Sequence, residues 1–137
     1  MSNVELHRAA HQAMSDEGAE QTAVYMAPDI VFTDYGRGMT MKGKEEATAW
    51  VAGWKSAFSD ARVTDATYHD AGDWTISQFT ARGTNDGPLG ELPATGQELD
   101  LACCELLRWQ DGKSQEGAFY YDSTTIMVQL GHIEAPM

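Results

Sequence analysis

The feature that most constrains the fold is a hairpin pattern in the last third of the chain. The pair Asp111-Gly112 separates two runs of alternating apolar and polar residues, 99–109 and 115–121. Asp-Gly between such runs favours a two-residue turn with both central residues at positive φ. The turn also sets the register, because paired positions in an antiparallel ladder sum to a constant. We expect these pairs: Gln110 with Lys113, Leu107 with Glu116, Glu105 with Ala118, Cys103 with Tyr120 and Leu101 with Asp122.

One face of this hairpin would then mix carboxylates with apolar side chains. Burying a lone carboxylate raises its pKa, and a raised pKa is what a general acid or base near neutral pH requires. Asp122, at the end of the second strand, is therefore predicted to be a catalytic proton-transfer group. Two alternatives stay open, because periodicity does not decide which face is inside. The face could be the solvent face, and Asp122 could only cap a short helix predicted over residues 124–130.

The rest of the chain predicts helices, then strands. Apolar spacing indicates helices over residues 4–14 and 19–26, the second ending before Pro28, which disfavours helix in the residue preceding it. A strand over 30–35, a helix over 44–58, a hairpin of strands over 62–69 and 74–84, and a long Gly- and Pro-rich loop over 85–96 follow. This order predicts an α+β fold, with helices packed on one face of a curved antiparallel sheet that encloses a cavity.

Several aromatic side chains are candidates for the wall of that cavity. Trp50 and Trp54 lie on the apolar face of the helix over residues 44–58, where they are either ordinary core or part of a pocket wall. Tyr35 closes the first strand beside Asp34, and its hydroxyl could reach the pocket mouth or only flank the turn at Gly36.

Composition excludes some classes of partner. The 137 residues suit one domain spanning 1–137, and 9 Lys and Arg against 21 Asp and Glu give a net charge of −12. Such a surface repels phosphate backbones and anionic lipid, so neither nucleic acid nor membrane is an expected partner. No apolar run has the length of a membrane span and the first residues are polar, which predicts a cytoplasmic protein.

Metal binding is not predicted. The neighbouring cysteines Cys103 and Cys104 would point to opposite faces of one strand, which favours two free thiols. His7 and His11 lie four residues apart on one helix face, a spacing that permits metal binding. The sequence indicates no third ligand for them, and we expect an exposed helical pair.

A set of short motifs in a fixed order resembles the SnoaL-like polyketide cyclase family. The resemblance covers residues 30–131 and rests on Phe58-Ser59-Asp60, residues 79–84, Gly87, residues 93–97, Asp111-Gly112-Lys113, Glu116, Tyr121-Asp122 and Gln129-Leu130-Gly131. It implies the cone-shaped α+β barrel shared with nuclear transport factor two and ketosteroid isomerase, with a deep apolar pocket. It also implies a homodimer, because such cones leave one sheet face open.

The resemblance further implies a cofactor-free intramolecular aldol ring closure on a small, hydrophobic, carbonyl-bearing substrate. In cyclases of this family the aspartate that begins the C-terminal helical turn is the acid/base group, and Asp122 matches it. Many members carry a histidine where this chain has Asn85, an amide that can donate a hydrogen bond but cannot shuttle protons at neutral pH. The expected substrate-binding residues are Tyr35, Trp50, Trp54, Asn85, Cys103, Glu105, Glu116 and Tyr120.

Other functions remain open for the same fold. The chain could be a module without catalysis that binds a hydrophobic ligand or dimerises. It could also be an isomerase or a hydrolase of an apolar carbonyl or epoxide, which would need a second pocket acid such as Glu105 or Glu116.

Overall fold

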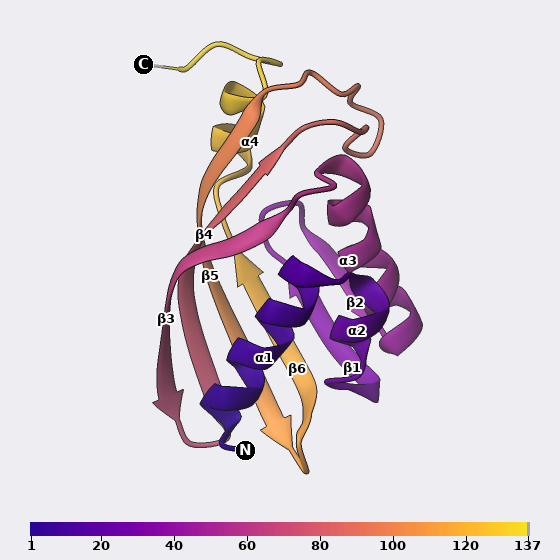
Figure 1. Cartoon of the computed structure of the whole chain (residues 1–137), viewed down its shortest axis with the longest axis vertical. Helices are drawn as coiled ribbons and strands as arrows, with labels where there is room; N and C mark the ends of the chain where they lie inside the picture. Colours follow the sequence, from indigo (N-terminus) through magenta and orange to yellow (C-terminus); the bar gives the residue numbers. More distant parts are fainter. Residues whose placement is uncertain (137) are drawn as a thin grey trace.

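The order of helices and strands matches the expected α+β plan (Figure 1). The computed structural model describes residues 1–136. Within them the helices are α1 (Asn3–Asp16), α2 (Ala19–Ala23), α3 (Lys44–Ala57) and α4 (Ser123–Gln129). The strands are β1 (Met26–Asp34), β2 (Met39–Lys42), β3 (Arg62–Ala71), β4 (Trp74–Thr84), β5 (Glu98–Gln110) and β6 (Lys113–Tyr120).

The strands form one curved sheet in the order β2-β1-β6-β5-β4-β3, with α1, α2 and α3 on one side of it (Figure 1). Neighbouring strands are antiparallel except β1 and β6, which run parallel. The sheet is therefore mixed, and the expectation of a wholly antiparallel sheet is wrong in this one pairing. None of the helices in the described part has the length and hydropathy that crossing a bilayer would require.

Three elements in the first third of the chain differ from the prediction. α2 ends at Ala23, and β1 begins at Met26 and includes Pro28. Proline is accepted there because the pairing of β1 with β6 is irregular between Met26 and Val31, so no ladder hydrogen bond is lost. Residues 39–42, for which no helix or strand was predicted, form β2 by pairing with β1.

A β-bulge in β6 changes the predicted register of the hairpin. Gln110 pairs with Lys113 as expected, and Trp109 pairs with Ser114, but Arg108 pairs with Glu116. Gln115 is the extra residue. A shift of one residue turns every following side chain to the other face. The pairs beyond the bulge are therefore Leu107 with Gly117, Glu105 with Phe119, and Cys104 with Tyr120, in place of those predicted.

The bulge decides which side chains are inside. The prediction is right for β5, where Leu101, Cys103, Glu105 and Leu107 are buried. It is wrong for β6, whose inward residues are Ser114, Gly117 and Phe119, while Glu116 and Tyr120 are exposed.

The helices and the inner face of the sheet enclose an apolar cavity of about 130 Å³. Aromatic side chains from α3, β4 and β6 form much of its wall: Trp50, Trp54, Phe79 and Phe119. An engineered cavity of about 150 Å³ holds benzene, so this one has room for a single ring.

Candidate functional site

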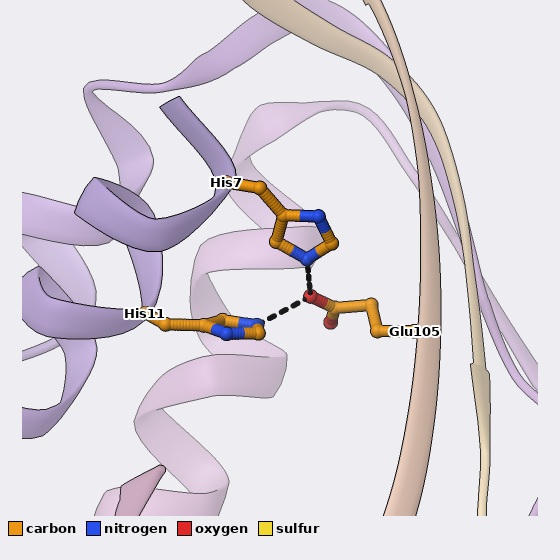
Figure 2. Close-up of side chains that lie close together, drawn as sticks. All are labelled: His7, His11 and Glu105. Atoms are coloured by element: carbon orange, nitrogen blue, oxygen red, sulfur yellow. Dashed lines mark hydrogen bonds and ion pairs between the residues drawn. The ribbon is translucent and has the colours of Figure 1, made fainter. Parts of the chain in front are cut away.

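Three ionisable side chains from distant parts of the chain meet beside the cavity. His7 and His11 project from α1 toward Glu105 on β5 (Figure 2). All three are buried, with exposed fractions of 0% for His7 and 8% for both others. His11 and Glu105 line the cavity itself. We call His7, His11 and Glu105 the His–Glu cluster.

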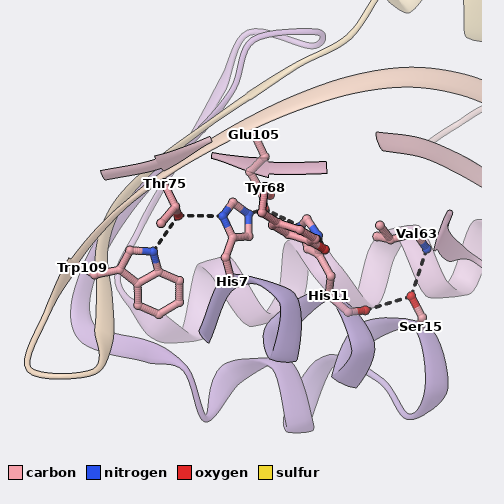
Figure 3. Close-up of polar contacts among 8 residues, drawn as sticks. All are labelled: His7, His11, Ser15, Val63, Tyr68, Thr75, Glu105 and Trp109. Atoms are coloured by element: carbon pink, nitrogen blue, oxygen red, sulfur yellow. Dashed lines mark hydrogen bonds and ion pairs between the residues drawn. The ribbon is translucent and has the colours of Figure 1, made fainter. Parts of the chain in front are cut away.

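The local structure of α1 explains why both histidines face inward. Ser2 caps the helix, accepting a hydrogen bond from the Glu5 backbone N–H at 3.1 Å. Residues at spacings of three and four then share one face of the helix, and this face contains His7, Ala10, His11 and Met14. At the other end Ser15 accepts from the Val63 N–H at 2.9 Å and donates to the His11 carbonyl at 2.8 Å, which ties α1 to β3 (Figure 3).

Both histidines bind the same carboxylate oxygen. The Nε2–H groups of His7 and His11 donate to Glu105 Oε1 at 2.9 and 2.7 Å. The other oxygen, Oε2, accepts no hydrogen bond from any side chain or backbone group of residues 1–136. One oxygen thus holds the carboxylate in place and the other is available to a molecule in the cavity.

A second layer of hydrogen bonds orients the two imidazole rings (Figure 3). Thr75 Oγ1 lies 2.7 Å from His7 Nδ1 and accepts from Trp109 Nε1–H at 2.9 Å. Because an indole N–H can only donate, the Thr75 hydroxyl is free to donate onward to His7 Nδ1, which leaves the proton of His7 on Nε2. The Tyr68 hydroxyl lies 2.8 Å from His11 Nδ1 in the corresponding position.

The charges of the cluster are coupled. Burial acts to raise the pKa of Glu105, but the charges and hydrogen bonds of His11 and His7 outweigh burial and lower this pKa to about 2. Burial lowers the pKa of His7, against the raising effect of Glu105. Burial also raises the pKa of Tyr68, which keeps its hydroxyl protonated. Glu105 is therefore ionised beside an apolar cavity.

A second buried carboxylate, Asp34 at the end of β1, has no free acceptor of this kind. Its side chain is fully buried and accepts from Trp50 Nε1 at 2.9 Å, the Tyr121 hydroxyl at 3.0 Å, and the N–H and Nε of Arg37 at 3.0 and 3.3 Å. These bonds join the end of β1 to α3 and to the residue after β6. Burial, and then the hydrogen bond to Asp34 and the charge of Asp34, raise the pKa of Tyr121. Asp34 therefore stabilises the fold by holding these segments together.

Three of the predicted site residues lie on the cavity wall: Trp50, Trp54 and Glu105. The Trp50 Nε1–H donates to Asp34 and so has no proton left for a ligand. The Trp54 Nε1–H is buried and has no partner among the described residues, so it remains a donor without an acceptor.

Asp122 lies on the surface and not in the cavity, which corrects its predicted position. β6 ends at Tyr120, and Asp122 is the exposed N-cap of α4. Its carboxylate accepts from the Thr124 N–H at 2.9 Å and from the Thr125 hydroxyl at 3.1 Å. The capping alternative describes what this side chain does, because a strand that ends at Tyr120 leaves Asp122 outside the ladder.

The other predicted binding residues also lie away from the cavity wall. Tyr35 and Tyr120 stack on each other on the outer face, with ring centroids 4.6 Å apart, and Glu116 pairs there with Arg108 at 3.2 Å. The bulge at Gln115 turned Glu116 and Tyr120 outward. Asn85 is fully buried, but its amide donates to the carbonyls of Ala57 and Gly87 and organises the loop. Cys103 is inward and buried without lining the cavity, and burial raises its pKa to about 12.

The sequence interpretation missed the two histidines, which were expected to be exposed. The signal that could have found them is their place in the apolar stripe of α1, which they share with Ala10 and Met14. A polar residue inside such a stripe is buried with the stripe, and it then needs a partner from another element.

Known proteins resemble this chain both in sequence family and in fold. A family model described as SnoaL-like polyketide cyclase matches residues 4–130. A candidate polyketide cyclase from Pseudomonas putida KT2440 has a similar structure, with a TM-score of 0.85, 20% identity, and coverage of 96% of this chain and 99% of that one. A candidate SnoaL-like polyketide cyclase from Jannaschia sp. CCS1 has a TM-score of 0.81 at 20% identity, with 97% of both chains covered.

A third similar structure is a hypothetical protein with a ketosteroid isomerase-like fold from Catenulispora acidiphila, in complex with trimethylamine. Its TM-score is 0.82 at 21% identity, with 95% of both chains covered. At these identities the solved structures establish the fold alone. No curated protein matches the chain.

Proposed function

Because the chain belongs to the SnoaL-like polyketide cyclase family, we propose that it catalyses proton transfer on an apolar, carbonyl-bearing molecule in the cavity. This is the step that an intramolecular aldol ring closure of a polyketide-type substrate requires. The observation that carries the proposal is the Oε2 atom of Glu105, which accepts no hydrogen bond from the described residues. Glu105 is the one acidic residue on the wall of this cavity among the described residues.

The proposed reaction uses Glu105 as its base. Oε2 removes a proton from a carbon next to a carbonyl, and the substrate becomes an enolate. The enolate carbon attacks a second carbonyl carbon of the same molecule, which forms the new carbon–carbon bond. The resulting alkoxide takes the proton back from Glu105, so the protein ends as it began.

The enolate needs stabilisation, because a carboxylate whose pKa is lowered to about 2 is a weak base. Trp54 lies on the cavity wall with a covered, unpartnered Nε1–H, and we propose that this N–H turns toward the enolate oxygen when the substrate binds. The apolar wall contributes by folding the substrate, since holding two reacting ends together lowers the barrier by several kcal/mol.

The volume of the cavity limits how much of a substrate it can hold. A volume of about 130 Å³ accommodates one ring of the size of benzene. A longer polyketide-type chain would place only its reacting end beside Glu105. We therefore expect small monocyclic ketones to serve as probes of the site.

The experiment measures exchange of the α-protons of cyclohexanone for deuterium by proton NMR. We expect the wild-type protein to accelerate exchange above the buffer rate, and Glu105→Gln to lose this acceleration by about 100-fold or more. Glutamine keeps an oxygen that can accept from both histidines, so this variant preserves the packing. Glu116→Gln, which removes an exposed carboxylate from the outer face, is the control and should exchange at the wild-type rate.

The same experiment distinguishes catalysis from ligand binding without catalysis. If cyclohexanone binds the wild-type protein but exchanges only at the buffer rate, the chain is a ligand-binding module and the proposal fails. Full acceleration by Glu105→Gln would also reject Glu105 as the base.

A further inference from the structure

We propose that the His–Glu cluster is a binding site for a divalent transition-metal ion, with zinc as the ion that its ligands suit best. Two imidazole nitrogens and one carboxylate oxygen are a ligand set that zinc binds readily. The two histidines sit at positions i and i+4 of one helix, and both present Nε2 to the same point. Zinc metalloproteases use this arrangement, with a third ligand from a different element.

The distances fit the proposal with small movements. The three ligand atoms lie within 4.8 Å of one another, and each Nε2 is within 2.9 Å of Glu105 Oε1. Bonds of about 2.0 Å in a tetrahedral site place ligand atoms about 3.3 Å apart. The two Nε2–Oε1 distances therefore need to lengthen by about half an ångström, and the Nε2–Nε2 distance needs to settle near the same value of about 3.3 Å. Each ring proton moves from Nε2 to Nδ1 as the ion enters.

The second layer of hydrogen bonds suits metal-binding histidines once each ring proton has moved from Nε2 to Nδ1, because Thr75 Oγ1 and the Tyr68 oxygen can then accept it. A ligating histidine is normally oriented by a hydrogen bond at its other ring nitrogen. Here Thr75 holds His7 Nδ1 and Tyr68 holds His11 Nδ1, at 2.7 and 2.8 Å. Both rings are thus positioned before an ion arrives.

An independent observation concerns Ser77, which pairs with Tyr68 across β3 and β4. Its hydroxyl is buried close to the Tyr68 hydroxyl and makes no well-formed hydrogen bond with the described residues. With zinc on His11 Nε2, the ring proton moves to Nδ1 and donates to the Tyr68 oxygen. The Tyr68 hydroxyl proton is then free to turn toward Ser77 Oγ, so metal binding supplies a donor for an unpartnered group.

Access and charge also favour a cation. His11 and Glu105 line the cavity, so a fourth coordination position can face a water or carbonyl oxygen there. His11 and Tyr68 also line a surface groove between α1 and β3, which gives an ion a path from solvent. The net charge of −12 attracts cations to the surface.

The experiment is calorimetric titration of Zn²⁺ into the full chain, without an affinity tag and after removal of bound metal. We expect one ion per chain with a Kd of about 1 µM or tighter. His11→Ala and Glu105→Gln should each weaken binding by about 100-fold or more, because each removes a ligand. His69→Ala, which removes an exposed histidine of β3, should leave the Kd unchanged.

A conservative variant guards against loss of folding. Tyr68→Phe removes only the hydroxyl at His11 Nδ1 and should weaken Zn²⁺ binding by about 10- to 100-fold, with an unchanged circular dichroism spectrum. Co²⁺ in place of Zn²⁺ should give the visible absorption of a four- or five-coordinate ion, absent in Glu105→Gln.

Wild-type binding weaker than about 100 µM, or equal binding by the wild type, His11→Ala and Glu105→Gln, would overturn the metal site. The outcome is separate from the proposed reaction. A chain that binds no zinc can still exchange protons through Glu105, and a chain that exchanges none can still bind zinc.

Discussion

Glu105 and Asp122 are both carboxylates near apolar strand patterns, yet their surroundings give them opposite roles. Glu105 is buried, accepts from two histidines and keeps one oxygen free beside the cavity. Asp122 is exposed and accepts from the first turn of α4. The chemistry of a carboxylate depends on the donors and solvent around it, and these come from the tertiary structure.

The cap at Asp122 makes a stability prediction. Asp122→Ala should lower the free energy of unfolding by about 1 kcal/mol, because the Thr124 N–H loses its acceptor. Asp122→Asn should change it by only a few tenths of a kcal/mol, since asparagine caps helices about as well. Urea unfolding followed by circular dichroism measures both.

The same two variants test whether Asp122 takes part in catalysis. If Asp122 only caps α4, both should accelerate cyclohexanone exchange as the wild type does. Loss of exchange in a folded Asp122→Asn protein would restore Asp122 as the acid/base group and would contradict the role assigned to Glu105.

Among the elements, β6 has the greatest influence on the site. Its bulge at Gln115 sends Phe119 to the cavity and Tyr120 to the outer face. Gly117 follows on the inner face, where a Cβ atom would lie 2.8 Å from Leu107 Cδ2 and closer still to the Phe32 ring. The strand can sit this close to β1 and β5 only because that position has no side chain.

A substitution at Gly117 should therefore be costly. Gly117→Ala should lower the free energy of unfolding by about 2 kcal/mol, because the methyl group overpacks Phe32 and Leu107. The control is Ala118→Ser, at the next residue, whose side chain points to the outer face of the sheet. Its free energy of unfolding should stay within about 0.5 kcal/mol of the wild-type value. Equal unfolding midpoints of both variants in urea would show that β6 has room to move.

For the whole molecule, the outer face of the sheet is a surface that exposes large apolar side chains. Tyr35, Tyr120 and Val31 are 55%, 44% and 40% exposed, and the register places them on one face with Ala118. Exposed apolar patches of this kind commonly mark an interface, and a two-fold dimer covers a sheet face with one self-complementary surface. We therefore expect a second copy of the chain to cover it.

Sedimentation equilibrium tests this expectation. The wild type should have about twice the 15.0 kDa mass of the chain. Tyr120→Glu should shift the mass toward the monomer, because two buried carboxylates would face each other across the axis. Ala52→Glu, on the exposed side of α3, should remain a dimer. A monomeric wild type at tens of micromolar would refute the interface.

The sequence by itself determined the kind and order of nearly all the elements, the turn at Asp111-Gly112 and the family resemblance. Helical spacing, strand alternation and turn chemistry act over a few neighbouring residues, so they can be read locally. The tertiary structure alone decided the site. Glu105 meets His7 and His11 across 98 and 94 residues of chain, and one extra residue, Gln115, set which face of β6 is inside. Both depend on packing between elements, which no local pattern encodes.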